Sequence, residues 1–215
     1  MIRSVRPIIR NIGLNLVNHI KIRGIYAPYF FNNTKRRISM KVIFLDIDGV
    51  LNSIQFSKKR YEKYKKTGKW DIAIDDSKVK MLKEIIDKSG GPDEVKVVLS
   101  SSWRKHFSEV NGKMFPKDNT GEDCRYAFSK HDIVLYSRTG SSKDGNRGKE
   151  ITEWMDSHSN LNITHYVVID DETIDILEYI PQNYIVKPNY NLGGIDDSHV
   201  RAAIHILNNG ENTIK

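Results

Sequence analysis

Three short apolar runs in this sequence end abruptly in polar side chains, and this pattern limits the fold more than any other feature. The runs end at Asp46, Ser100 and Asp170. A short unbroken apolar run is typical of a strand that is buried on both faces, as in a parallel sheet. Ligands bind such sheets at the carboxyl ends of their strands. The sequence therefore predicts that three distant segments bring acids and a hydroxyl group to one sheet edge.

The chain from residue 41 onward alternates between strand patterns and helix patterns. Apolar runs predict strands at Lys41–Asp46, Val95–Leu99, Asp132–Tyr136, Tyr166–Ile169 and Tyr184–Val186. Apolar residues at helical spacing predict helices at Ser77–Lys88, Lys149–Ser157 and His199–Leu207. We expect an α/β protein with a three-layer, Rossmann-like fold around a central, mainly parallel sheet. The stretches 52–94 and 105–146 are too short for a large cap domain.

The basic character of the chain belongs to its N-terminal region. The formal net charge is +7, yet residues 1–41 hold nine basic residues and no acidic residue. The remaining 25 basic and 27 acidic residues give the body a net charge of −2, which argues against a globally basic nucleic-acid-binding domain. We predict a flexible basic extension at 1–40 and a folded domain at 41–210. Two explanations of the extension stay open: a mitochondrial transit peptide, or an arm that precedes a true start at Met40.

The single cysteine, Cys124, cannot form an intrachain disulfide, which indicates a reducing compartment. We expect a cytoplasmic protein, or a mitochondrial one if residues 1–40 are a transit peptide. No apolar stretch approaches the roughly 20 residues that a membrane-spanning helix needs, so no membrane partner is expected. No protein partner is indicated.

The first polar strand end carries two acids two residues apart, Asp46 and Asp48. On an extended chain this spacing places both side chains on one face. Two such carboxylates can ligate Mg²⁺, or one can attack phosphorus while the other transfers protons. Gly49 permits a tight turn and a close approach of the backbone to a bound phosphate. A solvated polar turn after a strand is the alternative.

The other strand ends supply groups that complement these acids. Ser100 and Ser101 follow a buried strand and can cradle a phosphate, or cap the next helix. Arg147 and Lys149 precede Asp170 by 23 and 21 residues, and either can supply the fixed cation that phosphoryl transfer requires. Asp170 and Asp171 repel each other unless a cation lies between them, which favours metal ligation.

These pieces occur in the order seen in the haloacid dehalogenase (HAD) superfamily of phosphatases. Residues 46–50 resemble its first motif, Ser100 the second, Lys149 or Arg147 the third, and Asp170-Asp171 the fourth. A closer resemblance covers most of 41–208. The segments 48–52, 99–104, 147–151 and 169–172 look like the small HAD domains associated with RNA-repair (Swiss Army knife) proteins. In that group the recurring basic residue matches Arg147, whereas the lysine of the wider superfamily matches Lys149.

The resemblance implies a Mg²⁺-dependent phosphatase in which Asp46 is the nucleophile and Asp48 the general acid and base. It also implies that Asp46, the Asp48 carbonyl and either Asp170 or Asp171 hold Mg²⁺. The phosphate-binding set is then Gly49, Ser100, Ser101 and either Lys149 or Arg147.

A site without a cap is open to macromolecular substrates. One basic run lies nearby in the sequence, and Lys63, Lys65 and Lys66 are its candidate substrate contacts. Tyr61, Tyr64 and Trp70 are interleaved with it, a combination that suits a nucleic-acid strand, although a solvated lysine-rich helix or loop explains it equally well. Arg104 can reach a substrate phosphate or form a surface ion pair, and Trp103 is expected to pack in the core.

We therefore predict a phosphohydrolase that acts through an aspartyl-phosphate, with RNA or DNA terminal phosphates as the preferred substrates. Two alternatives stay open at this point. The first is a phosphatase of nucleotides or other small phosphoesters, and the second is a catalytically idle module that binds nucleic acid or protein.

Overall fold

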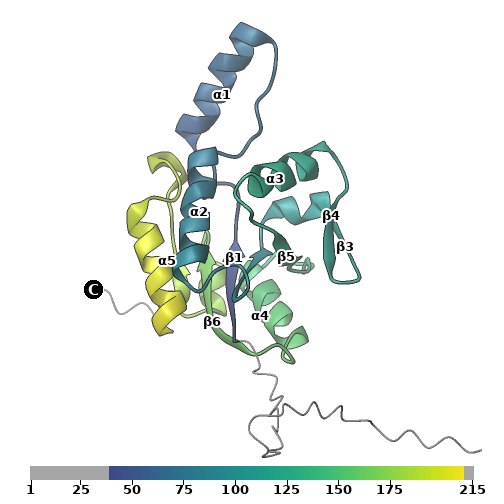
Figure 1. Cartoon of the computed structure of the whole chain (residues 1–215), viewed down its shortest axis with the longest axis vertical. Helices are drawn as coiled ribbons and strands as arrows, with labels where there is room; N and C mark the ends of the chain where they lie inside the picture. The colour runs from purple at the N-terminus through teal and green to yellow at the C-terminus, as the bar shows by residue number, and fades with distance from the viewer. Residues whose placement is uncertain (1–38, 211–215) are drawn as a thin grey trace, which may run out of the picture. The chain divides into compact units, whose positions relative to one another are not determined.

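The structure, a computed structural model, describes residues 39–210 (Figure 1). The predicted basic extension of residues 1–40 lies outside this part, apart from Ser39 and Met40, so its nature stays a prediction. The strands are β1 (Met40–Leu45), β2 (Val95–Leu99), β3 (Phe107–Val110), β4 (Lys113–Pro116), β5 (Leu135–Arg138), β6 (Ile163–Ile169) and β7 (Ile185–Val186). The α-helices are α1 (Ile54–Thr67), α2 (Asp76–Lys88), α3 (Asn119–Ser129), α4 (Arg147–Ser157) and α5 (Asp197–Asn209). The short 3₁₀ helices are η1 (Ser102–His106), η2 (Ile176–Glu178), η3 (Gln182–Tyr184) and η4 (Tyr190–Leu192).

A five-stranded parallel sheet in the order β5-β2-β1-β6-β7 forms the centre of the protein, which confirms the predicted α/β class. Leu45 at the end of β1 pairs with Leu99 of β2 on one side and with Ile169 of β6 on the other. The three strands therefore end level with one another. Because Asp46, Ser100 and Asp170 each follow one of these paired residues, all three arrive at the same edge of the sheet.

Helices cover both faces of the sheet and create two apolar cores. On one face, Ile43, Leu45 and Val97 pack against buried residues of α2 and α5. On the other, Val42 and Phe44 pack against Ile151 and Trp154 of α4. Figure 1 shows α2 and α5 on the opposite side of the sheet from α4. This arrangement confirms the predicted three-layer, Rossmann-like architecture, and residues 39–210 contain no large cap domain.

Helix α1 stands apart from these layers (Figure 1). It is capped by Ser53, whose hydroxyl accepts from the Phe56 N–H at 3.2 Å, and it ends at Gly68 with a left-handed φ of 66°. None of its residues is buried. Its charged residues therefore do not contribute to either core.

Two regions differ from the sequence expectation. The strand predicted at Asp132–Tyr136 begins only at Leu135, because Asp132 has a positive φ of 55° and Val134 is 81% exposed. The hairpin of β3 and β4 and helix α3 fill the interval between η1 and β5, where no element was expected. Within residues 39–210, no helix combines the length and apolar character needed to cross a bilayer.

Candidate active site

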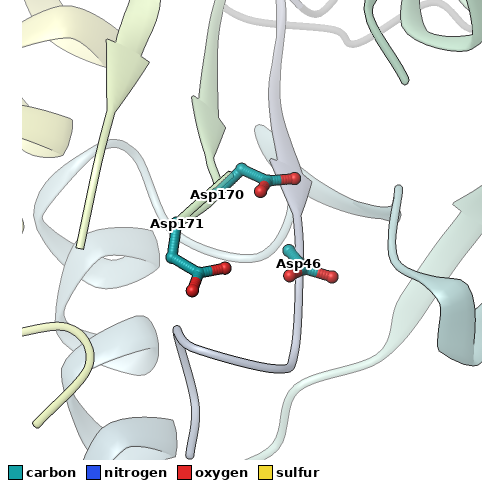
Figure 2. A group of neighbouring side chains, drawn as sticks. All are labelled: Asp46, Asp170 and Asp171. Atoms are coloured by element: carbon teal, nitrogen blue, oxygen red, sulfur yellow. The ribbon is translucent and has the colours of Figure 1, made fainter. Parts of the chain in front are cut away.

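Three carboxylates meet at the level ends of β1 and β6. Asp46, Asp170 and Asp171 each offer an oxygen, and these oxygens lie within 4.8 Å of one another. Figure 2 shows the three side chains grouped at the strand ends. Asp46 and Asp170 are buried, with 5% and 0% of their surface exposed. An oxygen-only set of buried acids at this spacing fits a hard divalent cation such as Mg²⁺.

Burial is the largest influence on the electrostatics of these acids. Burial raises the pKa of Asp46 to about 6, although a hydrogen bond from Ser101 and the charge of Arg147 act in the opposite direction. Burial, followed by the negative charge of Asp46, raises the pKa of Asp170 to about 8. Burial and the neighbouring Glu172 raise the pKa of Asp171. A cation at this cluster would favour the ionised form of all three acids.

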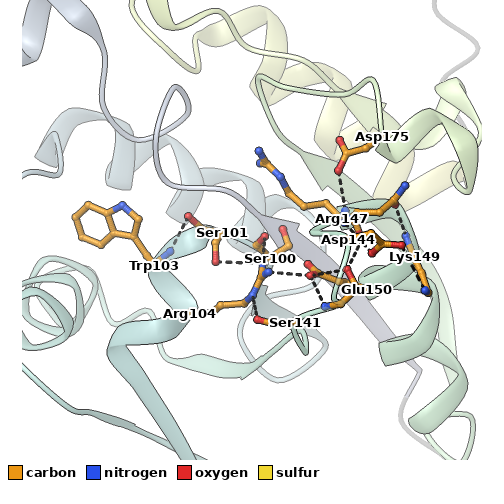
Figure 3. A network of polar contacts seen from close by, with 12 residues as sticks. Ser100, Ser101, Trp103, Arg104, Ser141, Asp144, Arg147, Lys149, Glu150 and Asp175 are labelled. Carbon is orange, nitrogen blue, oxygen red and sulfur yellow. Dashed lines mark hydrogen bonds and ion pairs between the residues drawn. The ribbon is translucent and has the colours of Figure 1, made fainter.

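Arg147 supplies the positive charge that the structure brings to the cluster. Its Nη1 lies 2.6 Å from Asp170 Oδ2 and 3.5 Å from Asp46 Oδ2. Its own N–H, at the start of α4, donates to Asp175 Oδ2 at 2.7 Å (Figure 3). Lys149 faces elsewhere, because its Nζ lies 3.5 Å from Asp144 Oδ2. Of the two candidates for the third motif, the arginine is the one in contact with the acids.

Gly49 occupies a position where a larger residue would displace the Asp171 carboxylate. It has a left-handed φ of 77°. A Cβ atom added to it would lie only 2.0 Å from Asp171 Oδ2. The absence of a side chain at Gly49 therefore lets the Asp171 carboxylate lie directly against the backbone of the first motif.

The two serines after β2 occupy different positions in the network. The Ser100 N–H donates to the Leu45 carbonyl at 3.0 Å, which extends the pairing of β2 with β1. Its hydroxyl is fully buried and has no hydrogen-bond partner among residues 39–210. The Ser101 hydroxyl accepts from the Trp103 N–H at 3.3 Å, and its proximity acts to lower the pKa of Asp46.

Arg104 forms a buried ion pair with Glu150 of α4. Its Nη2 lies 2.9 Å from Glu150 Oε1, and the two side chains are 12% and 1% exposed. Arg104 also donates to the Ser100 carbonyl at 3.1 Å and to Ser141 Oγ at 3.2 Å (Figure 3). The ion pair is therefore largely shielded from solvent, and contact of Arg104 with a substrate phosphate stays a prediction. This pair ties the turn after β2 to the start of α4.

The sequence did not indicate how Asp48 is held. Its Oδ1 accepts from Asn52 Nδ2 at 2.8 Å, and its Oδ2 accepts from Trp103 Nε1 at 2.9 Å. Trp103 packs in the core as expected, with 9% of its surface exposed, but the polar edge of its ring reaches the site. The signal available in the sequence was only that a tryptophan follows three serines at a strand end.

A cavity of about 500 Å³ joins these groups. Asp46, Asp48 and Arg147 line it, together with Arg104 and Tyr190. The predicted substrate contacts Lys63, Lys65 and Lys66 lie on α1 and do not line it. Lys63 pairs with Asp71 at 2.8 Å and Lys65 with Glu62 at 2.6 Å, whereas Lys66 has no ion-pair partner within the described chain.

The level strand ends of this parallel sheet present an Asp-x-Asp pair, a serine and an Asp-Asp pair, and the start of α4 adds Arg147. This combination is typical of a phosphatase-type α/β domain. Comparison with protein families supports the same class. The model of the HAD domain in Swiss Army Knife RNA repair proteins matches residues 42–200. This match covers most of the chain, so the chain belongs to this family. Comparisons with curated proteins and with solved structures gave no match.

Proposed function

We propose that this protein is a Mg²⁺-dependent phosphohydrolase that acts through an aspartyl-phosphate on Asp46. The observation that carries the proposal is the meeting of Asp46, Asp170 and Asp171 with Arg147 at the level ends of β1 and β6. Buried acids at this spacing destabilise a fold unless they have a ligand. A phosphohydrolase explains why these groups occur together.

In the proposed reaction, an Asp46 carboxylate oxygen attacks phosphorus while the bond to the leaving oxygen breaks. Asp48 gives its proton to that oxygen, and the alcohol departs. Asp48 then takes a proton from water as the water oxygen attacks the phosphorus of the aspartyl-phosphate. The bond between phosphorus and Asp46 breaks, which releases inorganic phosphate and restores both acids to their starting states.

The residues around these acids fit distinct supporting roles. Asp46, Asp170 and Asp171, with the Asp48 carbonyl, would hold Mg²⁺. When bound, Mg²⁺ neutralises charge on the phosphoryl group and on the three acids. Arg147 stabilises the charge that spreads over the phosphoryl oxygens, a role that Lys149 fills less directly because its Nζ lies beside Asp144. The Ser100 and Ser101 hydroxyls and the Gly49 backbone are the proposed phosphate contacts.

We infer that the preferred substrates are terminal phosphates of RNA or DNA. Asp48 at the cavity is exposed, so the site is accessible without removal of a cap. Helix α1 begins eight residues after Asp46 and carries a cluster of free cations and aromatic rings. Three lysines of α1 have no ion-pair partner among the described residues: Lys58, Lys59 and Lys66. The same holds for Lys69 in the loop that follows.

The aromatic rings beside these lysines form a stack that a nucleic-acid base can extend. Trp70 lies parallel to Tyr64 with a centroid distance of 4.3 Å, and Tyr61 lies 6.3 Å from the same ring. Trp70 and Tyr61 remain 56% and 51% exposed. Cations that follow a phosphate backbone and rings that stack on bases are the two features of non-specific single-strand binding. The family description, which refers to RNA repair, agrees with this class of substrate.

The test compares 3′- and 5′-phosphorylated oligonucleotides with p-nitrophenyl phosphate, with Mg²⁺ and across a range of salt concentrations. Oligonucleotide turnover is expected to fall steeply with salt, because binding to the backbone releases counterions, whereas the small ester should respond weakly. Replacing Lys58, Lys59, Lys66 and Lys69 with alanine should reduce the oligonucleotide salt slope and spare the small ester. Replacing Lys63 and Lys65 should have a smaller effect, since each already has an acidic partner.

The control replaces Lys83 and Lys88 of α2, which form ion pairs with Asp87 and Glu84. Equal salt slopes for the two substrate classes would favour the alternative of a phosphatase for nucleotides or other small phosphoesters. Oligonucleotide binding without turnover of any phosphoester would favour the catalytically idle module.

A further inference from the structure

The side chain of Asp48 is exposed, but both of its oxygens are held by buried donors. Asn52, 7% exposed, donates to Oδ1, and Trp103, 9% exposed, donates to Oδ2. An exposed carboxylate ordinarily samples several rotamers in water. Here two groups that belong to the packed interior fix its position instead.

We propose that Trp103 and Asn52 are positioning residues that orient the Asp48 carboxylate for proton transfer to the leaving group. This inference rests on the proposed function, because it takes Asp48 as the general acid and base. The two residues come from different segments, since Asn52 follows β1 and Trp103 lies on η1 after β2. The orientation of Asp48 therefore depends on the alignment of both strand ends.

Asn52 is itself fixed by three hydrogen bonds. Its Nδ2 donates to Asp48 Oδ1 at 2.8 Å and to the Ala73 carbonyl at 3.2 Å, and its Oδ1 accepts from the Gly49 N–H at 3.0 Å. If the Asn52 side-chain amide were turned by 180°, its oxygen would face the acceptors of Asp48 and Ala73, and its NH₂ group would face the Gly49 N–H. All three hydrogen bonds would then be lost. Asn52 thus has one compatible orientation, and that orientation directs an N–H at Asp48.

Trp103 is fixed by packing. Its ring belongs to the core that includes Phe107 and Leu99, and its backbone N–H donates to the Ser101 hydroxyl. The indole N–H has no acceptor other than Asp48 Oδ2 among the hydrogen bonds of residues 39–210. A buried indole N–H without an acceptor costs free energy, so the ring and the carboxylate hold each other in place.

The chemistry of the two donors determines where a proton on Asp48 can lie. An indole N–H and an amide NH₂ are donors only, so neither can accept a proton from the carboxyl group. Each carboxylate oxygen has a second lone pair that these bonds leave unused. A proton carried by Asp48 therefore lies on a lone pair that neither donor occupies, and Asp48 lines the cavity where the leaving oxygen would be.

The leaving group of the substrate provides the test. p-Nitrophenyl phosphate releases a stable anion that needs no proton, whereas 4-nitrobenzyl phosphate, of similar size, releases an alkoxide that does. Trp103→Phe keeps an aromatic ring but removes the N–H donor. We expect its kcat/KM for the benzyl ester to fall at least about tenfold more than that for the phenyl ester, since general acid catalysis contributes about 10²–10⁴-fold. Asn52→Asp removes the donor to Asp48 but keeps an oxygen that can accept from the Gly49 N–H. It should show the same selective loss of kcat/KM for the benzyl ester, and it decides the case if Trp103→Phe does not fold.

Trp154→Phe is the matched control. Trp154 is also buried, at 4% exposure, and its Nε1 donates to Ser137 Oγ at 3.1 Å outside the cavity. This change should leave the ratio of the two kcat/KM values as in the wild type. A purely structural role for Trp103 would lower both values alike.

Asp48→Asn separates the inference from the proposed function. If Asp48→Asn lowers the benzyl-to-phenyl ratio but Trp103→Phe and Asn52→Asp do not, the positioning role is refuted and the proposed function stands. If Asp48→Asn also leaves the ratio unchanged, the assignment of Asp48 as general acid is wrong, and the inference is overturned with it.

Discussion

Gly49→Ala is expected to weaken Mg²⁺ binding with only a modest cost to the fold. The added Cβ would lie 2.0 Å from Asp171 Oδ2 and 2.1 Å from its carboxyl carbon, so the carboxylate must move. Asp171 is only half-buried, so its side chain can rotate away without disturbing either core. That rotation separates it from Asp46 and Asp170, with which it forms the proposed metal site.

The magnitude has two parts. Alanine at a left-handed φ costs about 1–2 kcal/mol of stability, whether or not metal is present. Mg²⁺ at 100 times its Kd stabilises the wild type by about 2.7 kcal/mol. If displacement of Asp171 weakens binding tenfold, about 1.3 kcal/mol of that stabilisation disappears. For a domain of this size the loss corresponds to a Mg²⁺-induced Tm shift that is smaller by about 3–5 °C.

The assay is thermal unfolding with and without Mg²⁺, and the chain offers a matched control. Gly68 has a φ of 66°, close to the 77° of Gly49, but a Cβ added there would contact nothing within 4 Å. Gly68→Ala should therefore lower the Tm through backbone strain while it keeps the full Mg²⁺-induced shift. An undiminished shift in Gly49→Ala would refute the metal role of Asp171, and no shift in the wild type at millimolar Mg²⁺ would refute the site itself.

Four further predictions concern other parts of the molecule. Asp46→Asn should abolish nearly all turnover and retain the fold, because an amide is a poor nucleophile; wild-type hydrolysis by this variant would exclude the mechanism. Arg147→Gln should lower kcat by about 10²-fold or more, whereas Lys149→Gln should have little effect on it. If steady-state kinetics show the reverse, the third motif is assigned to the lysine. Cys124 is fully buried, and burial raises its pKa to about 12. Iodoacetamide should therefore label it at pH 8 only as fast as the protein unfolds. Rapid labelling, measured by mass spectrometry, would contradict its burial. Asp196 caps α5, and the Ser198 hydroxyl is the main cause that lowers its pKa to about 2, so Asp196→Ala should cost about 1 kcal/mol at pH 7 in urea unfolding. Because the folded pKa lies below the usual value of about 4, that cost should shrink as pH falls from 4 toward 2, and a cost independent of pH would reject the charge effect.

The central fold was predictable because its elements bury a repeating apolar pattern. The strands that end at Leu45, Leu99 and Ile169 are buried over their last three or four residues, and α2 buries the four apolar residues that its spacing indicated. Helix α1 gave no such signal, since none of its residues is buried and its few apolar and aromatic residues are outnumbered by charged ones. The predicted start of β5 was wrong because Ile133 belongs to the apolar core but precedes the strand, so the apolar run begins before the strand does.

For the candidate site, the sequence indicated which groups converge but not how they are oriented. Asp46 and Asp170 could be placed together because residues after paired strand ends share an edge. The choice between Arg147 and Lys149 depends on the direction of side chains at the first turn of α4, which spacing alone does not determine. The hydrogen bond from Trp103 to Asp48 joins residues 55 positions apart, and only their arrangement in three dimensions reveals it.

Two hydrogen bonds close the base of the segment that carries α1. The Asp75 N–H donates to the Leu51 carbonyl at 2.8 Å, and Asn52 Nδ2 donates to the Ala73 carbonyl at 3.2 Å. Leu51 and Ile74 at this base are both core residues, whereas no residue of α1 is buried. A segment with a closed base tolerates insertions along its length, because its two ends are already held together. During evolution this segment can lengthen, shorten or change its charge while the acids at the sheet edge stay in place. The fold thus holds α1 and the acids at the sheet edge by separate contacts, which makes α1 the natural position for engineering a new specificity.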